Sequence, residues 1–310
     1  MRLRKKLVNG QEYYYLEESV RLEKPKVYSV FLGRRVPEKS LLGKKREDLL
    51  NTVYSDLLKG ATRIYLSKQE LIEAEKRRRR YAQKMKKLGK AGTEERDEID
   101  AINFVYTTLS TEGVPITRQD AELAYRFSQH NAKSLRDENL RVALDMVRGL
   151  RFVKGSKPGL TNNLVLEIHR IIMAEYKEKN PGAFRRKQAY IYLKSYAQVE
   201  EIGFRPPAPD EIEKKLDELV FWYNENMGKL NALELAAILH LRVYSIHPFD
   251  DGNKRVSRLL LNKALFDSGY PILNISKDPQ PYFDALVASV ERKEDQPFVK
   301  FVHKFFVEWV

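Results

Sequence analysis

Residues 247–258 bring together side chains that could bind a polyphosphate and move a proton. The segment reads His-Pro-Phe-Asp-Asp-Gly-Asn-Lys-Arg-Val-Ser-Arg. His247 could accept a hydroxyl proton at neutral pH, because imidazole has an unperturbed pKa of about 6.5. Asp251 could hold Mg²⁺, which usually takes one or two carboxylates together with phosphate oxygens and water. The segment therefore indicates chemistry on a polyphosphate.

A helix that starts within this segment would supply an anion site. Apolar residues recur at helical spacing over residues 256–266, and the N–H groups at a helix start point outward. Arg255 and Arg258 fall on one face of the first turns, so two guanidinium groups would lie beside these donors. Taken singly, each residue also has a structural explanation: His247 as a loop residue, Asp251 as a helix N-cap and Arg258 as a surface charge.

The neighbouring elements should hold this segment in place. Residues 231–245 have the apolar spacing of a buried helix, and Pro248 biases His247 out of helical geometry. Phe249 is the one large apolar residue of the loop, so we expect it to anchor the loop to the core. From Glu94 onward the pattern is almost entirely helical. The exception is residues 188–204, which we expect to form a short β-hairpin.

The first 92 residues differ in composition from the rest. Residues 10–33 are rich in aromatic and β-branched residues, typical of a small hairpin or meander, and residues 43–58 have helical spacing. Ser67 is expected to cap a long basic helix from residue 68 to about 88, and residues 89–93 to form a break or linker. We predict a basic domain over residues 1–92 and a second domain over residues 93–310.

The charge of the chain is concentrated in the basic first part. The net charge is +13, and residues 1–100 hold 26 of the 56 Lys and Arg but only 16 of the 43 Asp and Glu. Such a module could bind nucleic acid, although basic helices are also ordinary solvated surface. No zinc-finger spacing or RNA-recognition motif is present to decide between them. Recruitment of a target is a further alternative for this domain.

Composition excludes several classes of protein. The 310 residues include no cysteine, so there is no disulfide, thiolate nucleophile or cysteine-based zinc site. No apolar run approaches the roughly 18 residues of a membrane-spanning helix, and the N-terminus lacks the apolar core of a signal peptide. We expect a cytoplasmic protein without a membrane segment. The remaining histidines lack paired metal-ligand spacing and are expected to be structural: His130, His169, His240 and His303.

Residues 247–258 resemble the core motif of the Fic (Fic/Doc) family, His-x-Phe-x-Asp/Glu-Gly-Asn-Gly-Arg-x-x-Arg. Every defining position matches except Lys254, which replaces a glycine. The resemblance extends from about Asp97 to the C-terminus and does not cover the first 90 or so residues. It implies a mainly α, Fic-type helical domain with a short β-hairpin flap, here preceded by a small α+β basic N-terminal domain.

The resemblance also implies an enzyme that transfers AMP from ATP to a hydroxyl of a protein target. His247 would be the general base and Asp251 the Mg²⁺ ligand. The nucleotide would be bound by Gly252, Asn253, Lys254, Arg255, Arg258 and Tyr282, with Arg258 at the γ-phosphate and Tyr282 at the adenine. The flap at residues 188–204 would pair with an extended target segment, so that a Ser, Thr or Tyr hydroxyl meets the α-phosphate.

Residues 108–113, Thr-Leu-Ser-Thr-Glu-Gly, match the inhibitory pattern of the same family, Ser/Thr-x-x-x-Glu-Gly/Asn. The resemblance implies an inhibitory helix over about residues 97–112. If Glu112 reached Arg258, its carboxylate would occupy the guanidinium that the γ-phosphate needs. The alternative is that Glu112 and Gly113 merely end a helix.

Lys254 leaves the transferred group open. Doc-like members of the family carry Asn-Lys-Arg and transfer phosphate, whereas members with Gly-Asn-Gly-Arg typically transfer AMP. This chain has the lysine of the first type, but Gly252, Arg258, the flap and the inhibitory pattern of the second. AMP transfer is therefore preferred, with protein phosphotransfer as the alternative. A non-enzymatic nucleic-acid-binding regulator is the alternative from another class, and a homodimer is left open.

Overall fold

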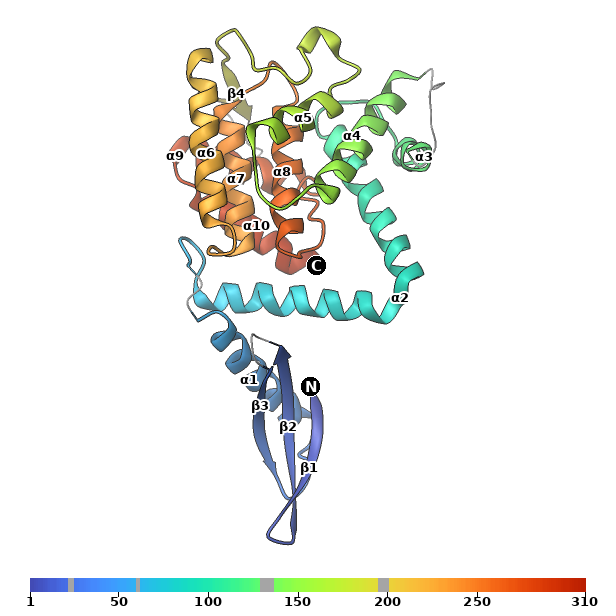
Figure 1. The fold of residues 1–310 in the computed structure, drawn as a ribbon, viewed down its shortest axis with the longest axis vertical. Coiled ribbons are helices and arrows are strands. Elements are labelled where there is room, and N and C mark those ends of the chain that lie inside the picture. The colour runs from blue at the N-terminus through green and yellow to red at the C-terminus, as the bar shows by residue number, and fades with distance from the viewer. Residues whose placement is uncertain (22–24, 60–61, 129–136, 195–200) are drawn as a thin grey trace. The chain divides into compact units, whose positions relative to one another are not determined.

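The computed structural model describes residues 1–21, 25–59, 62–128, 137–194 and 201–310 (Figure 1). The chain divides into two compact units, which we describe separately. Unit 1 comprises residues 1–61 and 67–77, and unit 2 comprises residues 62–66 and 78–310. The boundary expected between residues 92 and 93 thus lies inside unit 2. In the described part of the chain, no helix combines the length and the apolarity needed to cross a membrane.

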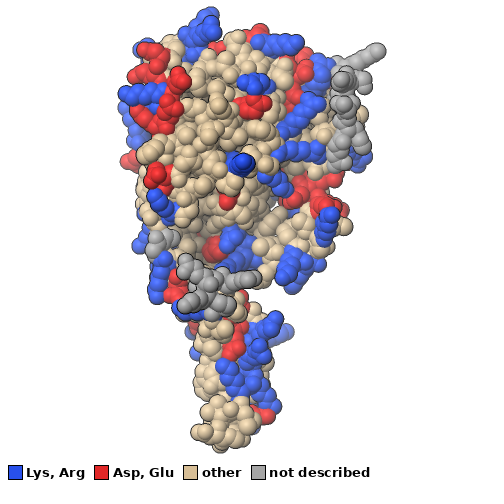
Figure 2. Space-filling model, in the orientation of Figure 1, with Lys and Arg blue, Asp and Glu red and all other residues tan. Residues whose placement is uncertain are grey.

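Unit 1 is built on an antiparallel meander of three strands and one long helix. The strands are β1 (Arg2–Val8), β2 (Gln11–Arg21) and β3 (Pro25–Gly33), and the helix is α1 (Lys39–Leu57). Leu16, Val20 and Tyr28 of the sheet form a core with Leu49 and Val53 of α1. On the face shown in Figure 2, Lys and Arg side chains lie along the β1 side of the sheet.

The meander expected over residues 10–33 is confirmed, but β1 was not predicted. This strand is rich in charge and all its side chains are exposed, so it has no apolar alternation to reveal it. Its pairing with β2, which joins Arg4 to Tyr15 and Lys6 to Tyr13, makes it a strand.

Helix α2 (Lys68–Ser110) starts where Ser67 was expected to cap it. The Glu70 N–H donates to Ser67 Oγ at 3.3 Å, and the Ser67 N–H donates to Glu70 Oε2 at 2.7 Å, which is a capping box. Of the break or linker expected over residues 89–93, the structure shows a break and no linker. Only Gly89 leaves helical geometry, at φ 70° and ψ −170°, and the helix resumes at the next residue. A single glycine can adopt this conformation, so a kink replaces the linker.

Over its described residues, unit 2 is mainly helical with one hairpin, which confirms the prediction of a mainly α fold. Its other helices are α3 (Arg118–Phe127), α4 (Glu138–Gly155), α5 (Asn162–Ile172), α6 (Ile212–Asn226), α7 (Ala232–Ile246), α8 (Asn253–Asp267), α9 (Pro279–Arg292) and α10 (Gln296–Trp309), with short 3₁₀ turns at Lys177–Lys179 and Pro209–Glu211. Helices α7 and α8 are buried over almost their whole length. The pair lies at the centre of the domain, with α4 and α5 packed on α8 and with α6 and α10 packed on α7 (Figure 1).

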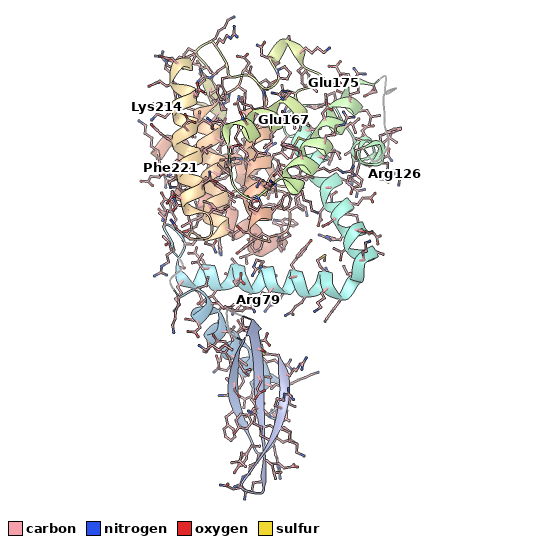
Figure 3. All side chains as sticks on the ribbon, in the orientation of Figure 1. Arg79, Arg126, Glu167, Glu175, Lys214 and Phe221 are labelled. Atoms are coloured by element: carbon pink, nitrogen blue, oxygen red, sulfur yellow. The ribbon has the colours of Figure 1, made fainter. Side chains whose placement is uncertain are left out.

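Helix α6 shows the amphipathic pattern of a covering helix. Ile212, Leu216 and Tyr223 are buried on its inner side. Lys214 and Phe221 lie on its outer side, where Figure 3 labels them, and Phe221 is 71% exposed. Neither Lys214 nor Phe221 is among the predicted site residues.

The hairpin expected at residues 188–204 is confirmed over its described residues. Strands β4 (Ile191–Lys194) and β5 (Glu201–Phe204) pair antiparallel, with Tyr192 opposite Gly203. The predicted strand residues Val199 and Glu200 lie outside the described residues.

A buried carboxylate holds residues 62–66 against the rest of unit 2. Glu234, in the first turn of α7, is fully buried and accepts N–H bonds from Tyr65 at 2.7 Å and from Leu66 at 2.6 Å. The Ile64 N–H lies 3.2 Å from the same carboxylate. Several donors on one carboxylate compensate its loss of hydration, so this segment is held by the start of α7.

Candidate active site

The loop between α7 and α8 is closed by a left-handed residue and a buried ring. His247 ends α7 at φ 49° and ψ 59°, and its N–H donates to Val243 O at 3.0 Å. Phe249 is fully buried, and its ring stacks on His169 with a centroid separation of 3.7 Å. The expected anchoring role of Phe249 is confirmed. The loop is therefore held by packing on one side and by the end of α7 on the other.

Asn253 closes the loop with its side-chain amide. Its Nδ2 donates to Phe249 O at 2.8 Å, while its Oδ1 accepts from Phe249 N at 3.0 Å. Both ends of the amide are thus used within the loop. The side chain shapes the site, and what Asn253 can offer an anion is its backbone N–H.

Helix α8 begins at Asn253, three residues earlier than the apolar pattern predicted. Its N-cap is Gly252, at φ 76°, and no side chain caps the helix. Asp251 is therefore not the N-cap; its Oδ1 accepts from Gly252 N at 2.5 Å. The N–H groups of the first turn have no acceptor within the helix, and the helix dipole adds positive potential there. The start of α8 thus has the properties of an anion site.

A glycine is needed at position 252 because the backbone has a positive φ and because Met173 leaves no space for a Cβ. A Cβ at Gly252 would lie 2.8 Å from Met173 Sδ, whereas at Gly228, with φ 78°, it would meet nothing within 4 Å. Gly228→Ala should therefore show the cost of positive φ alone, about 1 kcal/mol in the free energy of unfolding. Gly252→Ala should cost more and should weaken nucleotide binding, because the loop must move away from Met173.

Urea unfolding and nucleotide titration of the two variants would check this. Equal losses of stability, with unchanged nucleotide affinity in Gly252→Ala, would contradict the prediction.

Glu112 lies between the two arginines of α8. Its Oε1 is 3.3 Å from Arg258 Nη1, and its Oε2 is 3.1 Å from Arg255 Nε. The contact with Arg258 is a hydrogen bond, and that with Arg255 is an ion pair outside hydrogen-bond geometry. Arg258 is fully buried and Arg255 is 4% exposed. Arg258 is thus no surface charge, and two buried cations share the single negative charge of Glu112.

Aromatic rings line the other sides of the two arginines. Arg258 Cζ lies 4.9 Å from the Tyr282 ring centroid, and Arg255 Cζ lies 5.6 Å from that of Tyr176. The Tyr282 hydroxyl is 3.3 Å from His240 Nε2. Tyr282 is fully buried, so in this conformation it supports Arg258. Its assignment to the adenine pocket stays a prediction.

Both arginines retain unused donors. Nε and Nη2 of Arg258 and Nη1 of Arg255 are buried without a hydrogen-bond partner among the described residues. Unpaired buried donors of a cation are costly. A phosphate offers several charged oxygen acceptors, so the pair is suited to an anion larger than one carboxylate.

At the end of α2, Gly113 terminates the helix and Glu112 also reaches Arg258, so the two alternatives considered for this segment are both present. Gly113, at φ 81°, ends the helix, and the Val114 N–H returns to Leu109 O at 3.1 Å. Arg258 Nη1 also donates to Thr108 O at 3.0 Å, and Thr107 Oγ1 donates to Asn274 Oδ1 at 2.7 Å. The helix end therefore places Glu112, and it is itself fastened to the core.

His247 has the electrostatics of a neutral base. Burial is the main cause that lowers its pKa to about 4, and the charges of Arg185 and Lys254 lower the pKa further. Its Nδ1 lies 3.4 Å from Tyr244 O. A proton on Nδ1 facing this carbonyl would leave the lone pair of Nε2 free to accept a proton.

Two residues that position the loop were not predicted to do so. Arg185 is 2% exposed. Its side-chain Nε donates to His247 O at 2.7 Å, and its backbone N–H donates to Pro248 O at 2.9 Å. His169 accepts from Gly182 N at 2.9 Å through Nδ1, so its Nε2 carries the proton and faces Asp251 O at 3.2 Å. Burial lowers the pKa of His169 to about 4, which keeps this arrangement neutral.

No local pattern in the sequence marks either residue. His169 was expected to be structural, and its two hydrogen-bond partners lie in loops 13 and 82 residues further along the chain. His240 and His303, also expected to be structural, are buried, whereas His130 lies outside the described residues.

Asp251 and Lys254 lie at the more open side of the loop. The Asp251 side chain is 46% exposed, with Oδ1 3.5 Å from Arg255 Nη2. One such carboxylate fits Mg²⁺, which is held largely by phosphate oxygens and water. Among the described residues, no group of three or more His, Asp or Glu could form an all-protein metal cage. Lys254 Nζ lies 5.7 Å from the Phe283 ring centroid.

Comparisons with known proteins show similarity to Fic proteins, in agreement with the motif at residues 247–258. Residues 159–265 match the sequence model described as Fic, Fic/DOC family. The protein adenylyltransferase Fic of Drosophila erecta is 28% identical over 203 residues, which cover 64% of this chain and 39% of that protein. The chain thus spans well under half the length of this relative.

Solved structures show the same fold. A Fic domain containing signaling protein from Bacteroides thetaiotaomicron has a TM-score of 0.63 and 25% identity, covering 75% of this chain and 93% of that one. Fic-1 from C. elegans has a TM-score of 0.54 and 22% identity, covering 87% and 72% of the two chains.

Proposed function

We propose that this chain is a protein adenylyltransferase, which transfers AMP from ATP to a hydroxyl of a target protein, because residues 159–265 match the sequence model of the Fic/DOC family. The observation that carries this proposal is the pair of buried arginines beside the uncapped start of α8. Their charge and unused donors call for a polyanion, and the Drosophila erecta relative named above is a protein adenylyltransferase.

In this proposal, the start of α8 and the two arginines bind the triphosphate. The first-turn N–H groups offer aligned donors, and Arg255 and Arg258 offer planar guanidinium groups. His247, neutral at pH 7, accepts the proton of the target hydroxyl at Nε2 as the oxygen attacks the α-phosphorus. The bond to the pyrophosphate leaving group breaks in the same displacement. Asp251 would hold Mg²⁺, whose charge offsets that of the phosphates.

We also propose that the described conformation is autoinhibited. Glu112 occupies the guanidinium groups that the γ-phosphate would need, and it adds negative charge at that position. ATP and Glu112 therefore compete for Arg258. An activating condition must withdraw the end of α2 or neutralise this carboxylate.

Strand β4 supplies a surface for the target. Tyr190, just before β4, and Tyr192 within it are 62% and 67% exposed, and the described residues of the hairpin form a sheet of two strands. An extended target segment could add to such an edge through main-chain hydrogen bonds, which require no particular target sequence.

Labelled ATP distinguishes AMP transfer from phosphate transfer. With Glu112→Gly protein, Mg²⁺ and α-labelled ATP, label should enter the protein, and a mass increase of one AMP should appear. Label entering from γ-labelled ATP alone would overturn AMP transfer in favour of phosphotransfer, for which Lys254 is the specific observation. Lys254→Gly creates the Gly-Asn-Gly-Arg motif, and if the protein transfers AMP, this variant should keep the same label pattern.

A further inference from the structure

The sheet of unit 1 has one face packed on α1 and another that no described residue of unit 1 covers. Directly opposed residues of an antiparallel pair share a face. Leu16 pairs with Val30 on the face toward α1. Tyr15 pairs with Arg4 and with Phe31 on the other face. We call this second side the open face and define it by Arg4, Lys6, Tyr13, Tyr15, Phe31 and Arg34.

Aromatic rings form the centre of the open face. The Phe31 ring centroid lies 5.8 Å from that of Tyr13 and 5.4 Å from that of Tyr15. Phe31 is 54% exposed. An aromatic cluster presented to solvent on a sheet would be stabilised by a flat, partly apolar partner such as a nucleic acid base.

Cations surround these rings. Lys6 Nζ lies 4.8 Å from the Tyr15 ring centroid, and Arg34 Cζ lies 5.9 Å from that of Tyr13. Lys6 and Arg4 also pair with Glu17, at 2.6 and 3.6 Å. Among the described residues of the three strands, Glu17 is the single acid on this face. The open face is therefore positive, in agreement with the Lys and Arg along β1 in Figure 2.

The basic run of α2, residues 76–80, is a weaker candidate for binding a polyanion than the open face. Lys76 is 8% exposed, donates to Asn51 Oδ1 at 2.7 Å and pairs with Glu47. Arg78 lies over the Tyr270 ring, with 5.5 Å from Cζ to the centroid. Part of this run is thus used inside the fold, whereas the cations of the open face border exposed rings.

We propose that the open face binds single-stranded nucleic acid, with phosphates on the cations and unpaired bases stacked on the rings. An acidic protein segment could satisfy the cations but would not use the aromatic cluster. A duplex keeps its bases stacked on one another, so the rings could not stack on them. The combination of rings and cations on one sheet face therefore favours a single strand.

The full chain provides matched controls for the test. Fluorescence anisotropy would measure binding of a labelled mixed-sequence 20-nucleotide single strand, of its duplex and of an acidic polyglutamate competitor. Phe31→Ala should weaken single-strand binding by about tenfold, because an aromatic–base stack is lost. Phe221→Ala, which removes an exposed ring from α6, should leave binding unchanged (Figure 3).

A double substitution tests the phosphate contacts. Arg4→Gln with Lys6→Gln should weaken binding and flatten its dependence on salt by about 1 to 2 in the log–log slope. Lys214→Gln, on the outer side of α6, should leave both unchanged.

Three results would overturn the proposal: Phe31→Ala binding like the parent, tighter binding of the duplex, or equal displacement by polyglutamate at matched charge. AMP transfer should persist in Phe31→Ala, so this test is separate from that of the enzyme.

Discussion

Replacing Glu112 by Gly or Gln should raise the transfer of labelled AMP to the protein itself by about tenfold to a hundredfold. A hydrogen bond to a charged group contributes about 1.5–3 kcal/mol, and 1.4 kcal/mol corresponds to a factor of ten. Removing the carboxylate frees Arg255 and Arg258 for the triphosphate and takes away a negative charge from its position. The measurement is the initial rate of label incorporation at fixed ATP.

The melting temperature, measured with and without ATP, distinguishes release of inhibition from a general loss of stability. Without Glu112, two buried guanidinium groups lose their carboxylate, so the melting temperature should fall. ATP should then raise it more in the variant than in the parent, because binding to the folded state stabilises it. Glu95→Gln removes an exposed carboxylate from the same helix and should change neither readout. A folded Glu112→Gln protein with an unchanged or lower rate would exclude the inhibitory role.

Replacing His247 by Ala in the Glu112→Gly protein should lower AMP transfer by roughly 10²–10⁴-fold, the usual contribution of a general base. Nucleotide affinity should change little, because the triphosphate is held by α8 and the arginines. Incorporation of α-label gives the rate, and titration with a non-hydrolysable ATP analogue gives the affinity.

His303→Gln is the matched control, since it removes another buried histidine of unit 2 and should retain transfer. If His247→Ala kept transfer within a few fold of its parent, the base would have to be another group. If the transfer rate and the nucleotide affinity both fell strongly, the role of His247 would be to maintain the structure of the loop and not to act as the base.

The two principal predictions differ in how far the sequence supports them. The motif at residues 247–258 contains the proposed base, the proposed anion site and their order along the chain, because a helix end, a proline turn and a helix start are local features. The matching of Glu112 to Arg258 is not local: 146 residues separate them. Only the packing of the end of α2 against α8 brings the carboxylate to the guanidinium.

The sequence by itself determined the helical class, the capping of α2 by Ser67, the anchoring of Phe249 and the hairpin at β4 and β5. These depend on periodicity, side-chain size and turn chemistry within a few residues. Tertiary structure alone decided that Arg258 is buried and that Arg185 and His169 hold the loop. Pairing with β2 also made β1 a strand. Burial and pairing depend on partners distant in sequence, so no local pattern could reveal them.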